Sequence, residues 1–209
     1  MCYKKLLLLM VLCLGFASAQ TEYSEEVKRL VVMLENEVGG EYEIGAGIVF
    51  ALARNRIYIA TASHVVDAED DAKLTAKFWQ LPGETFEASV LAPLDTSLDM
   101  SVVSVRVEDV GLKLEDFPFE LLTGGDIETS EKVISVGQGS GRPWVTLEQD
   151  LNVIGKEPGI LEVQFSGVSQ GESGGGIFNE RGELLGLIIS DAPPALRAID
   201  AETLLTTLE

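Results

Sequence analysis

The chain has 209 residues and a formal net charge of −19, because 34 acidic side chains outnumber 15 basic ones. Phosphate backbones and anionic membrane surfaces are bound by clustered Lys and Arg, so this balance argues against nucleic acid or an acidic lipid surface as a partner. A high negative charge is more simply explained as a soluble, non-associating surface.

Residues 1–19 have the pattern of a secretory signal peptide. Lys4 and Lys5 precede an apolar run, and Ala17-Ser18-Ala19 supplies the small residues of a cleavage site. We therefore expect a secreted or periplasmic protein whose mature chain begins at Gln20. An uncleaved anchor is the alternative, but the apolar run is short for a membrane span, so no stable span is expected after cleavage.

Both cysteines of the chain, Cys2 and Cys13, lie inside this expected signal. A lipoprotein site at Cys13 is disfavoured, because the residues before it are not small. The mature domain, expected over 20–209, would then have no disulfide and would depend on its hydrophobic core.

Short apolar segments separated by turn residues predict an all-β domain. Turn pairs such as Pro82-Gly83 and Pro158-Gly159 lie between them, which favours a sandwich or barrels. A helical turn is expected near residues 24–30, and a closing helix over 201–208 behind the capping residue Asp200. Strands are expected at 30–34, 44–52, 56–60, 73–79, 86–91, 100–107, 132–136, 145–147, 151–156, 160–165, 176–178 and 184–190.

The stretch Gly171-Glu172-Ser173-Gly174-Gly175-Gly176 carries the first candidate for chemistry. Small neighbours leave the hydroxyl of Ser173 accessible to act as a nucleophile. They also let the backbone N–H groups of Gly171 and Ser173 turn toward an oxyanion. Such runs are more often plain turns, so this motif alone does not establish a catalytic site.

A serine nucleophile needs a base, and His64 is the one histidine in the chain. It follows an apolar strand-like run, where a loop would present it. Asp99 heads another such run and is the candidate to orient the imidazole, whereas Asp95 lies in a polar turn. A metal role for His64 is disfavoured, because zinc would lack partner ligands. The acidic run 67–71 lacks the spacing of a calcium loop, so no metal or other cofactor is expected.

Three motifs resemble those of trypsin-like serine peptidases with the chymotrypsin fold. Thr61-Ala62-Ser63-His64 is similar to their Thr-Ala-Ala-His, residues 99–103 to Asp-Ile-Ala-Leu-Leu, and residues 171–175 to Gly-Asp-Ser-Gly-Gly, in the order His, Asp, Ser. The short intervals and Gly45-Ala46-Gly47 resemble the compact bacterial branch that includes the Do-like proteases. The resemblance implies two six-stranded antiparallel β-barrels, here with a short C-terminal helix. Only 36 residues follow Ser173, so the peptide-binding domain that the Do-like proteases carry after the peptidase is not expected.

Two residues depart from the family pattern and put a preformed oxyanion hole in question. Glu172 replaces the aspartate that pairs with a new N-terminus in trypsins, and Gly176 replaces a proline, which would give the backbone extra freedom. The resemblance also implies a substrate site at Gly167, Ile189 and Ser190. With glycine rather than an acid at position 167, a Lys or Arg preference is not supported, and small or apolar residues are favoured unless Asp191 faces the pocket.

The sequence thus predicts a serine endopeptidase that hydrolyses polypeptides through His64, Asp99 and Ser173. One alternative is a catalytically idle binding module on the same fold, with a collapsed oxyanion loop. Another is a small acidic envelope protein with a structural role, in which His64 takes no part in any hydrolysis.

Overall fold

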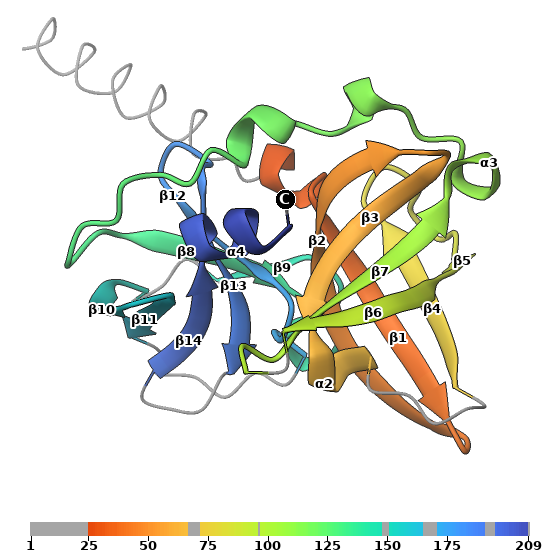
Figure 1. Cartoon of the computed structure of the whole chain (residues 1–209), viewed down its shortest axis with the longest axis horizontal. Helices are drawn as coiled ribbons and strands as arrows, with labels where there is room; N and C mark the ends of the chain where they lie inside the picture. Colours follow the sequence, from red (N-terminus) through yellow and green to blue (C-terminus); the bar gives the residue numbers. More distant parts are fainter. Residues whose placement is uncertain are drawn as a thin grey trace, which may run out of the picture.

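The computed structural model describes residues 25–66, 72–95, 97–147, 151–164, 171–190 and 195–208. Within them the strands form two antiparallel sheets of seven strands each, one from each half of the chain. The two sheets lie side by side, and the segment that links them crosses one end of the molecule (Figure 1).

The N-terminal sheet has the strand order β5-β4-β1-β2-β3-β7-β6. Only Ala88 separates β5 from β6, so one continuous segment pairs with β4 at its start and with β7 at its end. This segment joins the two edges of the sheet and closes it into a barrel. The strands are β1 (Val31–Val38), β2 (Glu41–Ala53), β3 (Arg56–Ala62), β4 (Lys73–Phe78), β5 (Phe86–Glu87), β6 (Ser89–Asp95) and β7 (Met100–Arg106).

The C-terminal sheet has the order β10-β11-β14-β13-β12-β8-β9. Its edges are also brought together, because β9 pairs with β8, a bridge joins Lys132 to Asn152 just before β10, and β10 then pairs with β11. The strands are β8 (Val133–Gly137), β9 (Val145–Leu147), β10 (Val153–Glu157), β11 (Ile160–Gln164), β12 (Gly176–Asn179), β13 (Leu184–Ser190) and β14 (Ala195–Asp200).

The expected all-β double barrel is confirmed, and the count of seven rather than six strands has a simple origin. In each barrel one strand is interrupted, between β5 and β6 and between β9 and β10, so six strand positions contain seven segments. The closing helix is also confirmed as α4 (Ala201–Leu208). Its cap is Asp200, whose Oδ1 accepts the N–H of Thr203 at 2.8 Å.

Several short elements were not expected from the sequence. Strand β14 is the clearest case, because Arg197 interrupts its apolar residues and Pro193-Pro194 precedes it. The others are a helical turn after β3, which is α2 (Ser63–Val66), and a turn between β8 and β9, which is η3 (Gly139–Gly141). Three more lie in the segment between the barrels: α3 (Val107–Val110), η1 (Leu114–Asp116) and η2 (Phe119–Leu121).

One continuous apolar core crosses the boundary between the barrels. Buried residues of the N-terminal barrel pack in the same cluster as Val136, Phe178 and Leu187 of the C-terminal barrel. A second cluster, which includes Leu161 and Ile177, fills the inside of the C-terminal barrel. Removing apolar surface from water is worth about 25 cal/mol per Å². The shared core therefore holds the two barrels in a fixed relative position, which a site between them requires.

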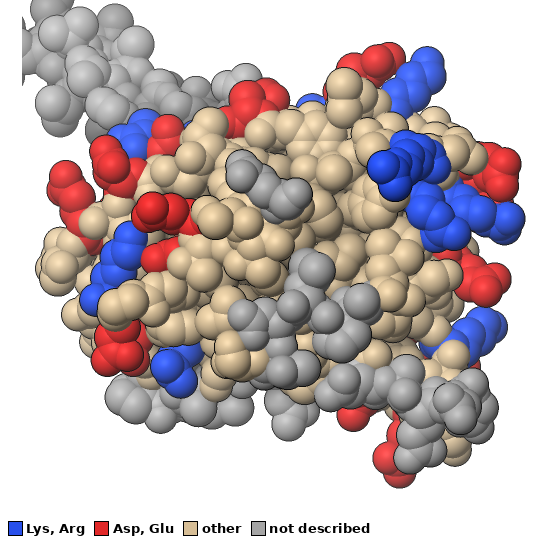
Figure 2. All heavy atoms as spheres, viewed as in Figure 1, with Lys and Arg blue, Asp and Glu red and all other residues tan. Residues whose placement is uncertain are grey.

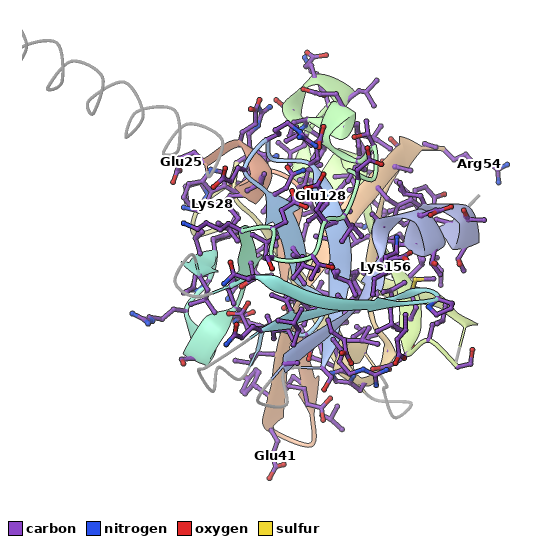
Figure 3. All side chains as sticks on the ribbon, turned by 90° about the vertical axis from the view of Figure 1, so that its left-hand side faces the viewer. Glu25, Lys28, Glu41, Arg54, Glu128 and Lys156 are labelled. Atoms are coloured by element: carbon purple, nitrogen blue, oxygen red, sulfur yellow. The ribbon has the colours of Figure 1, made fainter. Side chains whose placement is uncertain are left out.

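In Figure 2 acidic side chains lie mainly around the outline of the face, and Lys and Arg occur over both barrels, with the larger group at the edge formed by the N-terminal barrel. Figure 3 shows Glu41, at the start of β2, at the lower end of the N-terminal barrel. In the part of the chain that the structure describes, no helix is long and apolar enough to cross a bilayer.

An ion pair in the turn between β12 and β13 makes the stability of the folded protein depend on pH in the acidic range. Glu183 accepts hydrogen bonds from Arg181 Nη2 at 2.6 Å and from Asn179 Nδ2 at 2.8 Å. These bonds, the first more than the second, lower the pKa of Glu183 below its ordinary value of 4.5. The turn therefore contributes stability that is present above that ordinary pKa and is lost as the pH falls through the lowered value.

We expect Glu183→Gln to unfold at a temperature roughly one to two degrees below wild type at pH 7, because an exposed ion pair contributes little. The gap should close as the pH falls well below 4.5. Thermal unfolding monitored by circular dichroism from pH 7 to pH 3 would test this. A gap that stayed constant over the whole range would contradict it.

Candidate active site

His64 is presented to solvent by a short helical turn at the end of a buried strand. Every second residue of β3 from Ile57 onward is fully buried. In α2, Val65 and Val66 are buried as well, whereas the His64 side chain is 49% exposed. The strand and the two valines thus fix the turn to the barrel, and His64 is the residue that it exposes.

Asp99 holds this turn through three contacts. Its backbone carbonyl accepts the N–H of Ser63 at 2.9 Å, and its Oδ1 accepts the N–H of His64 at 3.1 Å. Its Oδ2 lies 2.5 Å from His64 Nδ1. A carboxylate only accepts, so the proton of the neutral ring lies on Nδ1 and the lone pair on Nε2 is left to act as a base.

The backbone at Asp99 has a φ of +54°, in the left-handed region. Asp adopts this conformation more readily than most residues, and it turns the chain sharply before β7. The carbonyl and the carboxylate thereby both face α2. Asp95, the competing residue in the sequence, has its backbone at the end of β6, and its side chain lies outside the described residues.

A buried hydroxyl pair also supports the histidine turn. Ser63 Oγ and Ser101 Oγ are 2.8 Å apart and almost fully buried. Ser63 precedes His64, and Ser101 lies two residues after Asp99, so the pair joins the same two segments a second time. Where the family motif has alanine, Ser63 of this chain adds a hydrogen bond.

Ser173 lies in a tight turn that leads into β12. The turn is attached to β13 by hydrogen bonds in both directions, from Gly174 N to Ile188 O at 2.7 Å and from Ile188 N to Gly175 O at 2.9 Å. It is attached to the other barrel by the N–H of Ala46, which donates to Ser173 O at 2.8 Å. Backbone hydrogen bonds to both barrels thus determine the position of Ser173.

Glycines allow this close approach to the N-terminal barrel. A Cβ at Gly174 would lie 1.9 Å from Ala46 O and 2.6 Å from Thr61 Oγ1. A Cβ at Gly45 would lie 2.7 Å from the methyl groups of Val65 and 2.9 Å from Ser173 O. Ser173 and the valine that follows His64 therefore lie on either side of one glycine.

The structure brings His64 and Asp99 into contact and bonds the backbone of Ser173 to the same barrel, but the serine hydroxyl and the imidazole are not hydrogen-bonded. This holds for the interactions of the described residues. Catalytic hydrogen bonds in unliganded sites are often long and shorten when substrate binds.

Gly171 and Ser173 are the two expected oxyanion donors. Gly171 has a φ of +96°, and its carbonyl accepts the N–H of Gln138 at 3.2 Å. Within the described chain no backbone carbonyl accepts the N–H of Gly171 or of Ser173. Within the described chain, neither donor is thus used by a backbone hydrogen bond.

Glu172 and Gly176, the two residues that depart from the family pattern, are both buried. Glu172 is fully buried and lies against Gly137. Gly176 is paired in β12, and a Cβ there would lie 2.5 Å from the ring of Phe178. The ring of Phe178 takes the space that a side chain at position 176 would need, which explains the glycine. The extra backbone freedom expected at Gly176 stays a prediction.

Of the expected substrate residues, Ile189 and Ser190 end β13, directly after the residue that is bonded to the Ser173 turn. The pairing of β13 with β14 skips Ile189, so its backbone is outside the ladder there. Gly167 and Asp191 lie outside the described residues. Among the described residues, no three side chains are grouped as metal ligands.

Sequence reasoning missed the supporting contacts of the site. Thr61 Oγ1 donates to Ala46 O at 2.6 Å, on the same residue whose N–H bonds Ser173. Thr61 and Ala46 both lie in motifs that the sequence analysis identified. A sequence motif does not show which backbone groups form hydrogen bonds with one another. Gln138 had no sequence signal, because its contribution is its backbone N–H.

Comparisons with known proteins relate the chain to one family. The sequence profile of the trypsin-like peptidase domain family matches residues 45–187. No curated protein matches the chain.

Two solved structures share its fold. The serine endoprotease from Yersinia pestis has a TM-score of 0.68 at 19% identity, and the match covers 88% of this chain and 64% of that one. The inactive mutant form of Rv3671c from M. tuberculosis H37Rv has a TM-score of 0.61 at 19% identity, with 87% of each chain covered. The chain thus spans less than two thirds of the Yersinia pestis chain.

The contact between Gly174 and the N-terminal barrel can be tested by adding one methyl group. Gly174→Ala should lower the free energy of unfolding by roughly 2 kcal/mol more than Gly83→Ala, measured by urea unfolding. Gly83 is a matched control, because its φ of +89° is close to the +80° of Gly174 and a Cβ there meets nothing within 4 Å. Equal losses in the two variants would mean that no collision occurs.

Proposed function

Since the chain belongs to the family of trypsin-like peptidase domains, we propose that it is a serine endopeptidase that cleaves polypeptides through an acyl-enzyme intermediate. The observation that carries the proposal is the hydrogen bond between Asp99 Oδ2 and His64 Nδ1. It leaves Nε2 of an exposed imidazole as a base, and backbone hydrogen bonds to both barrels hold the serine proposed as its partner.

In this mechanism Ser173 Oγ attacks the scissile carbonyl carbon while His64 Nε2 takes the hydroxyl proton. Asp99 stabilises the imidazolium that forms and keeps its orientation. The C–N bond then breaks as His64 returns the proton to the leaving amine. Water next attacks the acyl group, with His64 again as the base, and releases Ser173.

The tetrahedral oxyanion would be stabilised by the N–H groups of Gly171 and Ser173. No backbone carbonyl of the described chain accepts either N–H, which supports this role. Losing one such donor reduces kcat by about 10²–10³ where it has been measured in a serine protease. Whether the chain is an enzyme or an idle binding module therefore depends on the orientation of these two groups.

The substrate would lie along the end of β13. The unpaired backbone at Ile189 offers hydrogen-bonding groups to an extended peptide, next to the partly buried Ser190. Gly167 is proposed as a wall of the same pocket, which then takes small or apolar side chains rather than Lys or Arg.

The proposed location of the enzyme is outside the cytoplasm, secreted or periplasmic. The support is the charged, apolar and small-residue pattern of residues 1–19, which lie outside the described residues. Mass spectrometry of the exported protein should give a chain that begins at Gln20. A mass that retained Met1 would reject cleavage.

Labelling with a fluorophosphonate tests the nucleophile. The wild type should be labelled, and Ser173→Ala should not, because only an activated serine hydroxyl reacts with the phosphorus centre. Ser89→Ala is the matched control and should label like the wild type, since Ser89 is an exposed serine of β6 outside the site.

Two results would count against the proposal. Labelling that persisted in Ser173→Ala would place the nucleophile elsewhere. A folded wild type that neither labelled nor cleaved a peptide library would favour the idle binding module.

A further inference from the structure

The segment 138–144, which follows β8, has a strained backbone. Ser140, Gly141 and Trp144 have φ angles of +55°, +73° and +51°. Serine and tryptophan are costly in this region, so the conformation persists only if surrounding contacts hold it. We call this segment the 138–144 loop.

The start of the loop lies directly against Gly171. Gln138 N–H donates to Gly171 O at 3.2 Å, and a Cβ at Gly171 would lie 2.5 Å from Gln138 O. Ile44 of β2 packs against both Gly171 and Gly141. Its Cδ1 is 3.3 Å from the position of a Cβ at Gly171 and 3.7 Å from the position of a Cβ at Gly141. The loop and the proposed oxyanion donor are therefore in backbone contact.

The end of the loop is anchored on the other barrel. Trp144 Nε1 donates to Val31 O at 2.8 Å. The ladder between β1 and β4 begins at Val32 and Phe78, so Val31 lies one residue beyond it and the indole bonds its carbonyl. The ring of Trp144 also packs edge-on against Trp79, with centroids 5.4 Å apart.

A cation at the start of the described chain supports this anchor from the other side. Lys28 Nζ lies 4.9 Å from the centroid of a Trp79 ring. Lys28 is also paired with Glu25 at 2.7 Å, and the two lie together in Figure 3. Trp79 thus contacts both Lys28 and Trp144.

We propose that Trp144 is a positioning residue for the oxyanion donor Gly171. The inference rests on the proposed peptidase function. The hydrogen bond to Val31 and the contact with Trp79 hold the strained loop in place, and the loop holds the carbonyl of Gly171 through the N–H of Gln138. The donor N–H of Gly171 lies in the preceding peptide plane, which meets the plane of that carbonyl at the Gly171 Cα, so fixing the carbonyl restricts how the N–H can turn. Without the anchor the loop relaxes and the Gly171 N–H turns away from the oxyanion. Trp144 itself does not contact the reacting atoms.

The inference predicts a loss of rate rather than of substrate binding. Trp144→Ala should lower kcat roughly tenfold to hundredfold, less than the loss of a whole donor, because the donor is misplaced and not removed. KM should stay within about twofold, since oxyanion contacts form only in the transition state. Trp144→Phe keeps a ring beside Trp79 without the N–H, so its kcat should lie between those of wild type and Trp144→Ala.

Hydrogen exchange of the Gln138 amide supplies a readout that does not need activity. This amide makes the bond to Gly171 O, so its exchange should be faster in Trp144→Ala than in the wild type. The matched control is Phe119→Ala. Phe119 is another partly buried aromatic residue on the same core, and it lies in the segment between the barrels. Its variant should unfold at a lower temperature with kcat and Gln138 exchange unchanged.

The outcomes separate this inference from the proposed function. Faster exchange at Gln138 with a lower kcat supports both. Faster exchange in a protein whose wild type shows no hydrolysis supports the anchoring of Gly171 and rejects the peptidase. Unchanged exchange at Gln138, or an equal loss of kcat in Phe119→Ala, overturns the role of Trp144, whatever the activity of the wild type.

Discussion

The hydrogen bond from Ala46 N–H to Ser173 O is the contact on which the arrangement depends. It joins β2 of one barrel to the serine turn of the other, and the absence of a side chain at Gly174 lets the two backbones approach. The shared apolar core makes the contact durable, because separating the barrels would expose Val136, Phe178 and their neighbours to water. The relative position of imidazole and hydroxyl thus follows from packing rather than from any direct bond between them.

In the proposed mechanism the two barrels supply different parts of the chemistry. The N-terminal barrel would provide the base and the carboxylate that orients it, and the C-terminal barrel would provide the nucleophile and the backbone donors. Strained residues occur in both, at Asp99 and in the 138–144 loop. Each is held by contacts that hydrogen-bond or bury its neighbours, such as the Ser63–Ser101 pair and the Trp144–Val31 bond. Hydrogen bonds within and between the barrels thus stabilise the strained backbone at both positions.

The sequence predicted the double barrel and the closing helix, because alternating apolar strands, turn pairs and the cap at Asp200 are local signals. It also marked His64, Asp99 and Ser173, since each lies in a short motif whose chemistry is readable. It did not predict β14, whose apolar pattern is broken by Arg197, or the reason for Gly176, which is the ring of Phe178. The contacts of Gln138 and Trp144 join segments distant in the chain, and no local pattern records them. The proposed signal peptide and Gly167 remain predictions.

The most direct test of the account is a crystal structure of the mature chain with a phosphonate bonded to Ser173. The account predicts that the phosphoryl oxygen accepts hydrogen bonds of about 2.7–3.1 Å from the N–H groups of Gly171 and Ser173. It also predicts that His64 Nε2 lies within hydrogen-bonding distance of Ser173 Oγ while Nδ1 stays on Asp99. A phosphoryl oxygen turned to solvent, with the carbonyl of Gly171 or the imidazole facing away from the adduct, would contradict the convergence of these groups in one site.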